Sequence, residues 1–217
     1  MNFDQARKHM VDSQVRPNDV TDLNIQKALQ TLPREVFLPS EFRDQAYVDR
    51  ELSYAPGRSL IPARDFSKLL NALDIEKTDL ALDVACGAGY SSAVLAALSE
   101  MVVAVESDEK LAEEAQAHWS ALGIVNAAVI VAAPEKGAPK QGPFDIIIIP
   151  NAIETEPTAL LSQLKDGGRL GAIVRADGCS KGVIWRRSGD AFGRFEVFNS
   201  SAQVVTPGFE KIKTFVF

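Results

Sequence analysis

A short glycine-containing segment, DVACGAGY at 83–90, places an acidic residue and two glycines between an apolar run and a helix-like one. Gly87 and Gly89 allow the backbone to turn tightly beside a ligand, and Tyr90 opens the following helix. Glu106 lies 19 residues beyond Gly87, at the end of the next apolar run. In nucleotide-binding folds, an acid about 20 residues after such a turn accepts the hydroxyls of a ribose. Turn, helix and acid together predict a nucleoside ligand. A plain strand-to-helix turn with a surface glutamate is the simpler alternative.

The residues around the turn favour one nucleoside over another. A nicotinamide-dinucleotide fingerprint has Gly or Ala where this chain has Ser92. Asp83 would also repel a pyrophosphate, since it stands four residues before the first glycine. S-adenosylmethionine (AdoMet) has no phosphate and carries a cationic ammonium and a sulfonium, so a carboxylate beside the turn suits it. The segment therefore predicts AdoMet as the cofactor.

Strand-like and helix-like segments alternate from about residue 80 onward. Short, mostly apolar runs rich in β-branched residues predict strands at 80–84, 102–106, 127–131, 144–149 and 170–174. Helices are expected between them, at 90–99, 108–122 and 156–164. Runs that are apolar on both faces suit a parallel sheet covered by helices on each side. This alternation predicts a doubly wound α/β fold.

The end of the chain follows another pattern. Residues 182–198 form two alternating runs joined by Ser188, Gly189 and Asp190, which predicts an antiparallel hairpin. Residues 211–217 are expected to add a final strand. A mostly parallel sheet that ends in antiparallel strands is the layout of class I AdoMet-dependent methyltransferases, which have a Rossmann-like core, rather than of dehydrogenases.

The first 75 residues differ in character from the AdoMet-binding core expected at 76–217. Apolar residues at helical spacing predict one helix with a buried face, formed by Phe66, Leu69, Leu70 and Leu73. The stretch at 31–63 before it holds four prolines and no sustained period. We expect residues 1–75 to form a helical and irregular cap within the same domain. This cap would cover the edge of the sheet where open α/β folds bind ligands.

Composition narrows the class of protein. Of the 217 residues, 46% are hydrophobic, which is enough for one full core. A net charge of −6 argues against a protein that holds nucleic acid mainly through phosphate contacts. No apolar run approaches the roughly 18 residues of a membrane span, and the polar N-terminus is unlike a secretory signal. Two cysteines and two separated histidines predict a cytoplasmic protein without a metal site.

Several longer segments carry a specific resemblance. They are TLPREVFLP at 31–39, AYVDRELSYAPG at 46–57, DVACGAGYSSAVLA at 83–96, VVAVESDEKLAEEA at 102–115, GPFDIIII at 142–149 and QLKDGGRL at 163–170. The glycine turn and the last segment occur in many methyltransferases, whereas the first two are much more diagnostic. On these segments the chain resembles the protein-L-isoaspartate (D-aspartate) O-methyltransferase family over most of its length.

The resemblance implies an AdoMet-dependent carboxyl O-methyltransferase. Its acceptors would be isoaspartyl residues of damaged proteins or peptides, or a related carboxylate, with neither nucleic acid nor membrane as partner. Cofactor-binding positions carried over are Asp83, Ala85, Cys86, Gly87, Gly89, Tyr90, Glu106, Ser107 and Ala133. In the substrate segment, Tyr54, Arg58 and Ile61 would bind substrate, and Ser59 is the candidate catalytic residue. The guanidinium of Arg58 could clamp an acceptor carboxylate through two hydrogen bonds.

Three departures from the family pattern bear on function. The family's substrate loop has a serine beside the reacting carboxylate. Aligned from Gly57, that position holds Ile61, and Ser59 matches a threonine. Ala133 stands where the family has an aspartate facing the adenine amino group. Ala85 replaces the first glycine of the turn, a change that is tolerable if this residue keeps a negative φ.

These departures leave alternatives open. A lost hydrogen bond to a charged group costs roughly 1.5–3 kcal/mol. Ile61 would thus weaken transfer without abolishing it, because an anionic acceptor needs alignment more than a base. The alternative is a catalytically degenerate AdoMet-binding member with a binding or regulatory role. A nucleic-acid N-methyltransferase would need an Asn/Asp-Pro-Pro-aromatic tetrad after the fourth strand, where this chain has only Pro150-Asn151.

Overall fold

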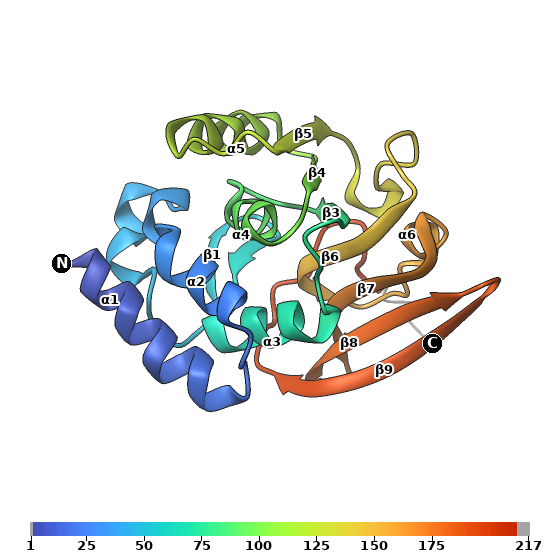
Figure 1. Ribbon diagram of the computed structural model, residues 1–217, viewed down its shortest axis with the longest axis horizontal. Helices are drawn as coiled ribbons and strands as arrows, with labels where there is room; N and C mark the ends of the chain where they lie inside the picture. The colour runs from blue at the N-terminus through green and yellow to red at the C-terminus, as the bar shows by residue number, and fades with distance from the viewer. Residues whose placement is uncertain (1, 212–217) are drawn as a thin grey trace, which may run out of the picture.

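The computed structural model describes residues 2–211, and Figure 1 shows how they are arranged. The N-terminal part contains helices α1 (Phe3–Met10), α2 (Leu23–Thr31) and α3 (Ala63–Leu73). Shorter helical turns lie between them at Val11–Val15, Arg16–Asn18, Arg34–Phe37 and Ser40–Gln45. Strands β1 (Leu52–Ala55) and β2 (Arg58–Leu60) pair only with each other, as a two-stranded antiparallel sheet. We call residues 52–60 the β1–β2 hairpin.

Within residues 2–211 the main sheet has seven strands, in the order β5-β4-β3-β6-β7-β8-β9. Their bounds are β3 Leu80–Val84, β4 Met101–Glu106, β5 Ala127–Val131, β6 Phe144–Ile153, β7 Leu164–Ala176, β8 Cys179–Ser188 and β9 Ala191–Ser200. The pairs from β5 to β7 are parallel, and β7, β8 and β9 pair antiparallel. Helices α4 (Tyr90–Leu98), α5 (Glu109–Ala121) and α6 (Thr158–Leu161) connect the parallel strands. The predicted α/β fold with antiparallel C-terminal strands is confirmed.

Apolar residues of the central strands alternate between two buried layers. Ala81, Ile146 and Ile148 join the layer that also contains residues of α3 and α4. Their neighbours Leu82 and Ile147 belong to the layer on the other face of the sheet. A strand buried on both faces has no polar side to display, which explains the uninterrupted apolar runs in the sequence.

Most predicted boundaries agree with the structure, and three differ. The strand expected at 170–174 spans Leu164–Ala176. The helix expected at 156–164 spans only Thr158–Leu161, because β7 already begins at Leu164. Strand β6 runs to Ile153 rather than residue 149, with a shift in its pairing to β7 after Ile149. The final strand expected at 211–217 lies outside the described residues, apart from Lys211.

The N-terminal segment packs against the glycine turn. Helix α3 buries the four expected apolar residues, Phe66, Leu69, Leu70 and Leu73. From the β1–β2 hairpin, the hydroxyl of Tyr54 accepts a hydrogen bond from the backbone N of Ala88 at 3.3 Å. The cap therefore shares a core with the sheet and lies directly against the turn that follows β3 (Figure 1). Among the described helices, none is long and apolar enough to cross a membrane.

Candidate active site

The turn between β3 and α4 has the left-handed backbone that its glycines permit. Gly87 and Gly89 have φ of +57° and +96°. Ala85 has φ of +62°, so the expectation that it keeps a negative φ is wrong. The backbone N atoms of Ala85 and Cys86 both donate to the carbonyl of Val105, at 2.8 and 3.1 Å, which holds the start of the turn against β4. A left-handed alanine costs roughly 1–2 kcal/mol.

Asp83 is the next-to-last residue of β3 and is fully buried. Its Oδ2 accepts hydrogen bonds from the hydroxyls of Ser91 and Ser92, both at 2.6 Å. Its Oδ1 is buried and has no partner among the described residues. Burial raises the pKa of Asp83 to about 6. A buried carboxylate with one unpaired oxygen suits a cationic group such as the ammonium of AdoMet, so the residues present fit that cofactor chemically.

Glu106 ends β4 and is also fully buried. Its Oε2 accepts from the backbone N of Gly87 at 2.8 Å, and its Oε1 accepts from the backbone N atoms of Ser107 and Asp108 at 2.7 and 2.9 Å. The two oxygens also accept from Nε and Nη2 of Arg58, at 2.8 and 2.5 Å. Burial by itself raises the pKa of Glu106, but the hydrogen bonds and charge of Arg58 and the backbone donors outweigh it, so the pKa lies below its usual value.

Arg58 and Tyr54 extend from the β1–β2 hairpin onto the turn. Arg58 is 2% exposed and donates through Nη2 to the hydroxyl of Ser107 at 3.1 Å. Sequence reasoning placed Arg58 on an acceptor carboxylate, whereas its guanidinium is turned toward Glu106 in the structure. The hydroxyl of Tyr54 lies on the open face of Gly87, only 1.9 Å from where a Cβ would stand. Burial raises the pKa of Tyr54 above its ordinary value.

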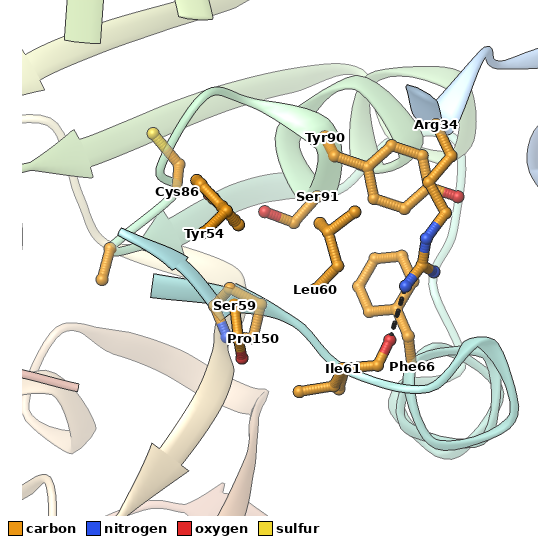
Figure 2. A pocket seen from close by; sticks show the side chains of 11 residues that line it. Arg34, Tyr54, Ser59, Leu60, Ile61, Phe66, Cys86, Tyr90, Ser91 and Pro150 are labelled. Carbon is orange, nitrogen blue, oxygen red and sulfur yellow. Dashed lines mark hydrogen bonds between the residues drawn. The ribbon is translucent and has the colours of Figure 1, made fainter. Parts of the chain in front are cut away.

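A small cavity lies between the glycine turn and the substrate segment (Figure 2). Its volume of about 20 Å³ is room for about one water molecule. The lining comes from the cap side through Arg34, Tyr54, Ser59, Leu60, Ile61 and Phe66, and from the core side through Ala85, Cys86, Tyr90, Ser91 and Pro150. The fold thus brings residues predicted for the cofactor and residues predicted for the acceptor into one place.

Ser59 and Ile61 both line this cavity but differ in their contacts. The hydroxyl of Ser59 lies 2.7 Å from Oε1 of Glu51 and 3.0 Å from Oδ1 of Asn151, so its hydrogen bonding is taken up within the protein. Ile61 is 3% exposed, and its carbonyl accepts from Nη2 of Arg34 at 2.7 Å. Ile61 is therefore a buried residue of the cavity wall whose backbone is bonded to Arg34.

Two further predicted cofactor residues form part of the buried wall. Burial raises the pKa of the Cys86 thiol well above its usual value, which keeps the thiol neutral. Tyr90 packs edge-on against Phe37, with ring centroids 5.6 Å apart, and the guanidinium of Arg34 lies 5.3 Å from its ring centroid. The hydroxyl of Tyr90 is buried without a partner in the described part of the chain.

Ala133 lies beyond the end of β5, where it precedes the short 3₁₀ helix Pro134–Lys136. The backbone N of its neighbour Ala132 donates to the carbonyl of Glu106 at 3.0 Å, which keeps this loop beside the end of β4. An alanine brings no polar side chain to this loop, and the assignment of Ala133 to the cofactor stays a prediction.

Sequence reasoning gave no role to Arg34 or Asn151. Arg34 is 2% exposed, and its Nε is buried without a partner among the described residues. Asn151 is 1% exposed and donates through Nδ2 to the carbonyl of Gly57 at 3.2 Å. Arg34 belongs to the diagnostic segment at 31–39, so its place in the sequence could have pointed to a role. No sequence feature pointed to Asn151, because its position in the site depends on the extension of β6 beyond residue 149.

Comparisons with known proteins point to one family. The family profile described as "Protein-L-isoaspartate(D-aspartate) O-methyltransferase (PCMT)" matches residues 5–192. A protein-L-isoaspartate O-methyltransferase of Maricaulis maris is 35% identical over 176 residues, covering 81% of this chain and 83% of the relative. A protein-L-isoaspartate O-methyltransferase of Koribacter versatilis is 34% identical over 168 residues, which cover 77% of this chain and 76% of that relative.

Two solved structures share the fold. One, named protein-L-isoaspartate O-methyltransferase, has a TM-score of 0.80 at 22% identity and covers 93% of this chain and 66% of that chain. The other is a candidate protein-L-isoaspartate O-methyltransferase of Plasmodium falciparum in complex with S-adenosyl-L-homocysteine. It has a TM-score of 0.77 at 16% identity and covers 94% of this chain and 99% of that chain. By its sequence profile and its relatives, the chain belongs to the protein-L-isoaspartate(D-aspartate) O-methyltransferase family.

Proposed function

We propose that this protein transfers a methyl group from AdoMet to the carboxylate of isoaspartyl residues in proteins or peptides. Membership of the family supports this class of reaction. The observation that carries the proposal is the shared cavity, in which Ala85 and Tyr90 of the cofactor turn meet Ser59 and Ile61 of the substrate segment (Figure 2).

When bound, AdoMet supplies a methyl group on a positively charged sulfur. In this proposal the unpaired Oδ1 of Asp83 holds the ammonium of the cofactor, and Glu106 accepts the hydroxyls of its ribose. Gly87 has no Cβ, and the hydroxyl of Tyr54 lies 1.9 Å from the position where a Cβ would stand. Ala133 offers the adenine no carboxylate, so we expect weaker cofactor binding than in relatives with an aspartate there.

The residues of this chain position the acceptor rather than activate it. A carboxylate is already an anion at pH 7, so the reaction requires no general base. The protein must still align the acceptor with the methyl group and exclude water. Leu60, Ile61 and Phe66 supply an apolar wall that excludes water from the cavity. Because Ile61 cannot donate a hydrogen bond to the acceptor, we expect a rate about 10- to 150-fold below that of a serine-containing site.

The proposal extends to partners and organisation. Residues 1–75 act as cap and substrate segment of the same domain, and 76–217 act as the AdoMet-binding core. The acceptors are polypeptides and not nucleic acid, in keeping with the net charge of −6. The two cysteines of the chain are free, in keeping with a cytoplasmic location.

The direct test is transfer of a tritiated methyl group from AdoMet to a peptide with one isoaspartyl residue. The matched acceptor is the same peptide with ordinary aspartate. We expect slow, base-labile labelling of the isoaspartyl peptide only. Binding of S-adenosyl-L-homocysteine (AdoHcy) is measured separately by calorimetry, with Glu106→Ala as the variant that loses affinity. AdoHcy binding without transfer to the isoaspartyl peptide would contradict the proposal.

A further inference from the structure

The β1–β2 hairpin lies where the proposed cofactor would bind. We propose that this hairpin is a gate on the cofactor site, closed by Arg58 on Glu106 and Tyr54 on Gly87, and that it must move before AdoMet binds. The inference rests on the assignment of Glu106 and Gly87 to the cofactor under the proposed function.

The carboxylate of Glu106 can accept only a limited number of hydrogen bonds. A carboxylate accepts at about four lone-pair positions. The described contacts already give it five N–H donors: the backbone N atoms of Gly87, Ser107 and Asp108, and Nε and Nη2 of Arg58. No position is left for the two hydroxyls of a ribose. The backbone donors belong to the turn and to the end of β4, so Arg58 is the partner that a ribose would replace.

The side chain of Tyr54 fills the space beside Gly87 in the turn between β3 and α4. The hydroxyl of Tyr54 lies 1.9 Å from the ideal Cβ position of Gly87, on the face that the glycine leaves open. It also accepts the backbone N–H of Ala88 at 3.3 Å. The neighbouring cavity has a volume of only about 20 Å³, far too small for a nucleoside. A ligand that approaches Gly87 must therefore displace the side chain of Tyr54.

A few side-chain contacts hold the β1–β2 hairpin against the main sheet. Its two strands pair with each other and not with the main sheet, so the hairpin can shift without breaking the main ladder. Asn151 ties it to β6 by donating to the carbonyl of Gly57 at 3.2 Å. The strongest attachment is the buried pair of Arg58 and Glu106, which are 3% and 0% exposed at their side chains. Breaking that pair opens the gate.

One consequence reaches the acceptor. Ser59 is part of β2, and Ile61 follows it directly, so a movement that frees Glu106 also moves the wall of the acceptor cavity. The gate thus couples the two sites: the cofactor binds first, and the acceptor segment then settles against it. A gate that is mostly closed lowers the apparent affinity for AdoMet by the fraction of molecules in which it is open.

The test measures AdoHcy affinity by calorimetry in three variants and the wild type. Arg58→Gln keeps a long polar side chain at this position and removes the charge pair with Glu106. We expect it to bind AdoHcy about tenfold more tightly or better, since the closed state loses its main attachment. Tyr54→Leu clears the face of Gly87 without unpairing a charge, so it keeps the test valid if Arg58→Gln folds poorly. It too should bind more tightly. The matched control is Arg194→Gln, whose arginine pairs with Glu196 on exposed β9 at 3.3 Å and should leave affinity unchanged.

The outcomes separate this inference from the proposed function. Weaker or unchanged AdoHcy affinity in both Arg58→Gln and Tyr54→Leu would overturn the gate, because the two side chains would then be ligand contacts or bystanders. Tighter binding in both variants supports the gate even if no protein transfers methyl groups to the isoaspartyl peptide, a result that would overturn only the function. Failure of every variant and the wild type to bind AdoHcy would overturn both.

Discussion

Arg34 and Ile61 are joined by a hydrogen bond of 2.7 Å from the guanidinium Nη2 to the backbone carbonyl, although they are 27 residues apart. The bond attaches the substrate segment to the short helix Arg34–Phe37, and the same guanidinium lies 5.3 Å from the ring centroid of Tyr90. The backbone at position 61 is therefore held independently of its side chain. A substitution of Ile61 changes what the cavity presents without releasing the segment.

We expect Ile61→Ser to raise methyl transfer to an isoaspartyl peptide by about tenfold or more. A hydroxyl beside an anionic acceptor adds a hydrogen bond worth roughly 1.5–3 kcal/mol. The measurement is the initial rate with tritiated AdoMet, expressed per molecule of folded protein. Since Ile61 is 3% exposed, its truncation also lowers the free energy of unfolding by about 2–5 kcal/mol.

Ile61→Ala is the control for that loss of packing. It leaves a similar space but brings no hydroxyl, so its rate should stay at or below that of the wild type. Equal rates for the serine and alanine variants would show that position 61 does not face the acceptor.

Ala85→Gly should stabilise the protein modestly. The left-handed φ of +62° costs an alanine roughly 1–2 kcal/mol, while a glycine adds about 0.5–1 kcal/mol of backbone entropy cost. The net gain in the free energy of unfolding is at most about 1.5 kcal/mol, and urea denaturation measures it. Ala88→Gly, in the same turn but without a positive φ, should instead destabilise. A loss of stability in both variants would mean that the strain at Ala85 is negligible.

The sequence predicted the turn and its acids because both depend on local order along the chain. The glycines permit a positive φ, Asp83 lies one residue before the end of β3, and Glu106 ends β4. Spacing along the chain and the parallel pairing of β3 with β4 fix these positions. Carboxyl ends of adjacent parallel strands meet at one edge of the sheet, so the two acids must lie near each other.

The contact between Arg58 and Glu106 was not predictable in the same way. The two residues are 48 positions apart and belong to separate sheets, so no periodicity connects them. The backbone of Ala85 was also missed, since an alanine at a positive φ runs against residue preference and is imposed by the bonds to Val105. In both cases tertiary packing decided a feature that local rules leave open.

Asp83 should make the stability of the protein depend on pH between about 4 and 6. Its pKa is raised from 3.8 to about 6 in the folded state by burial, so the folded protein binds a proton that the unfolded chain releases. Below pH 4 the protonated carboxyl therefore makes its full contribution to the free energy of unfolding. This contribution, about 3 kcal/mol in total, is lost as the pH rises through 6. Urea denaturation across this range should show the decline in the wild type, and less of it in Asp83→Asn. Exposed Asp190→Asn should keep the wild-type profile.

The same carboxyl should control cofactor affinity in the opposite direction. The cationic ammonium of AdoHcy favours the ionised form of Asp83, whose Oδ1 has no partner among the described residues. Affinity should consequently fall as pH drops below about 6, approaching a tenfold loss per pH unit once the carboxyl is protonated. Asp83→Asn should bind more weakly at pH 7.5 and show little change between pH 7.5 and 5. Calorimetry with AdoHcy at three or four pH values separates these profiles. Parallel curves for wild type and Asp83→Asn would remove Asp83 from the ammonium site and leave its carboxyl as a structural partner of Ser91 and Ser92.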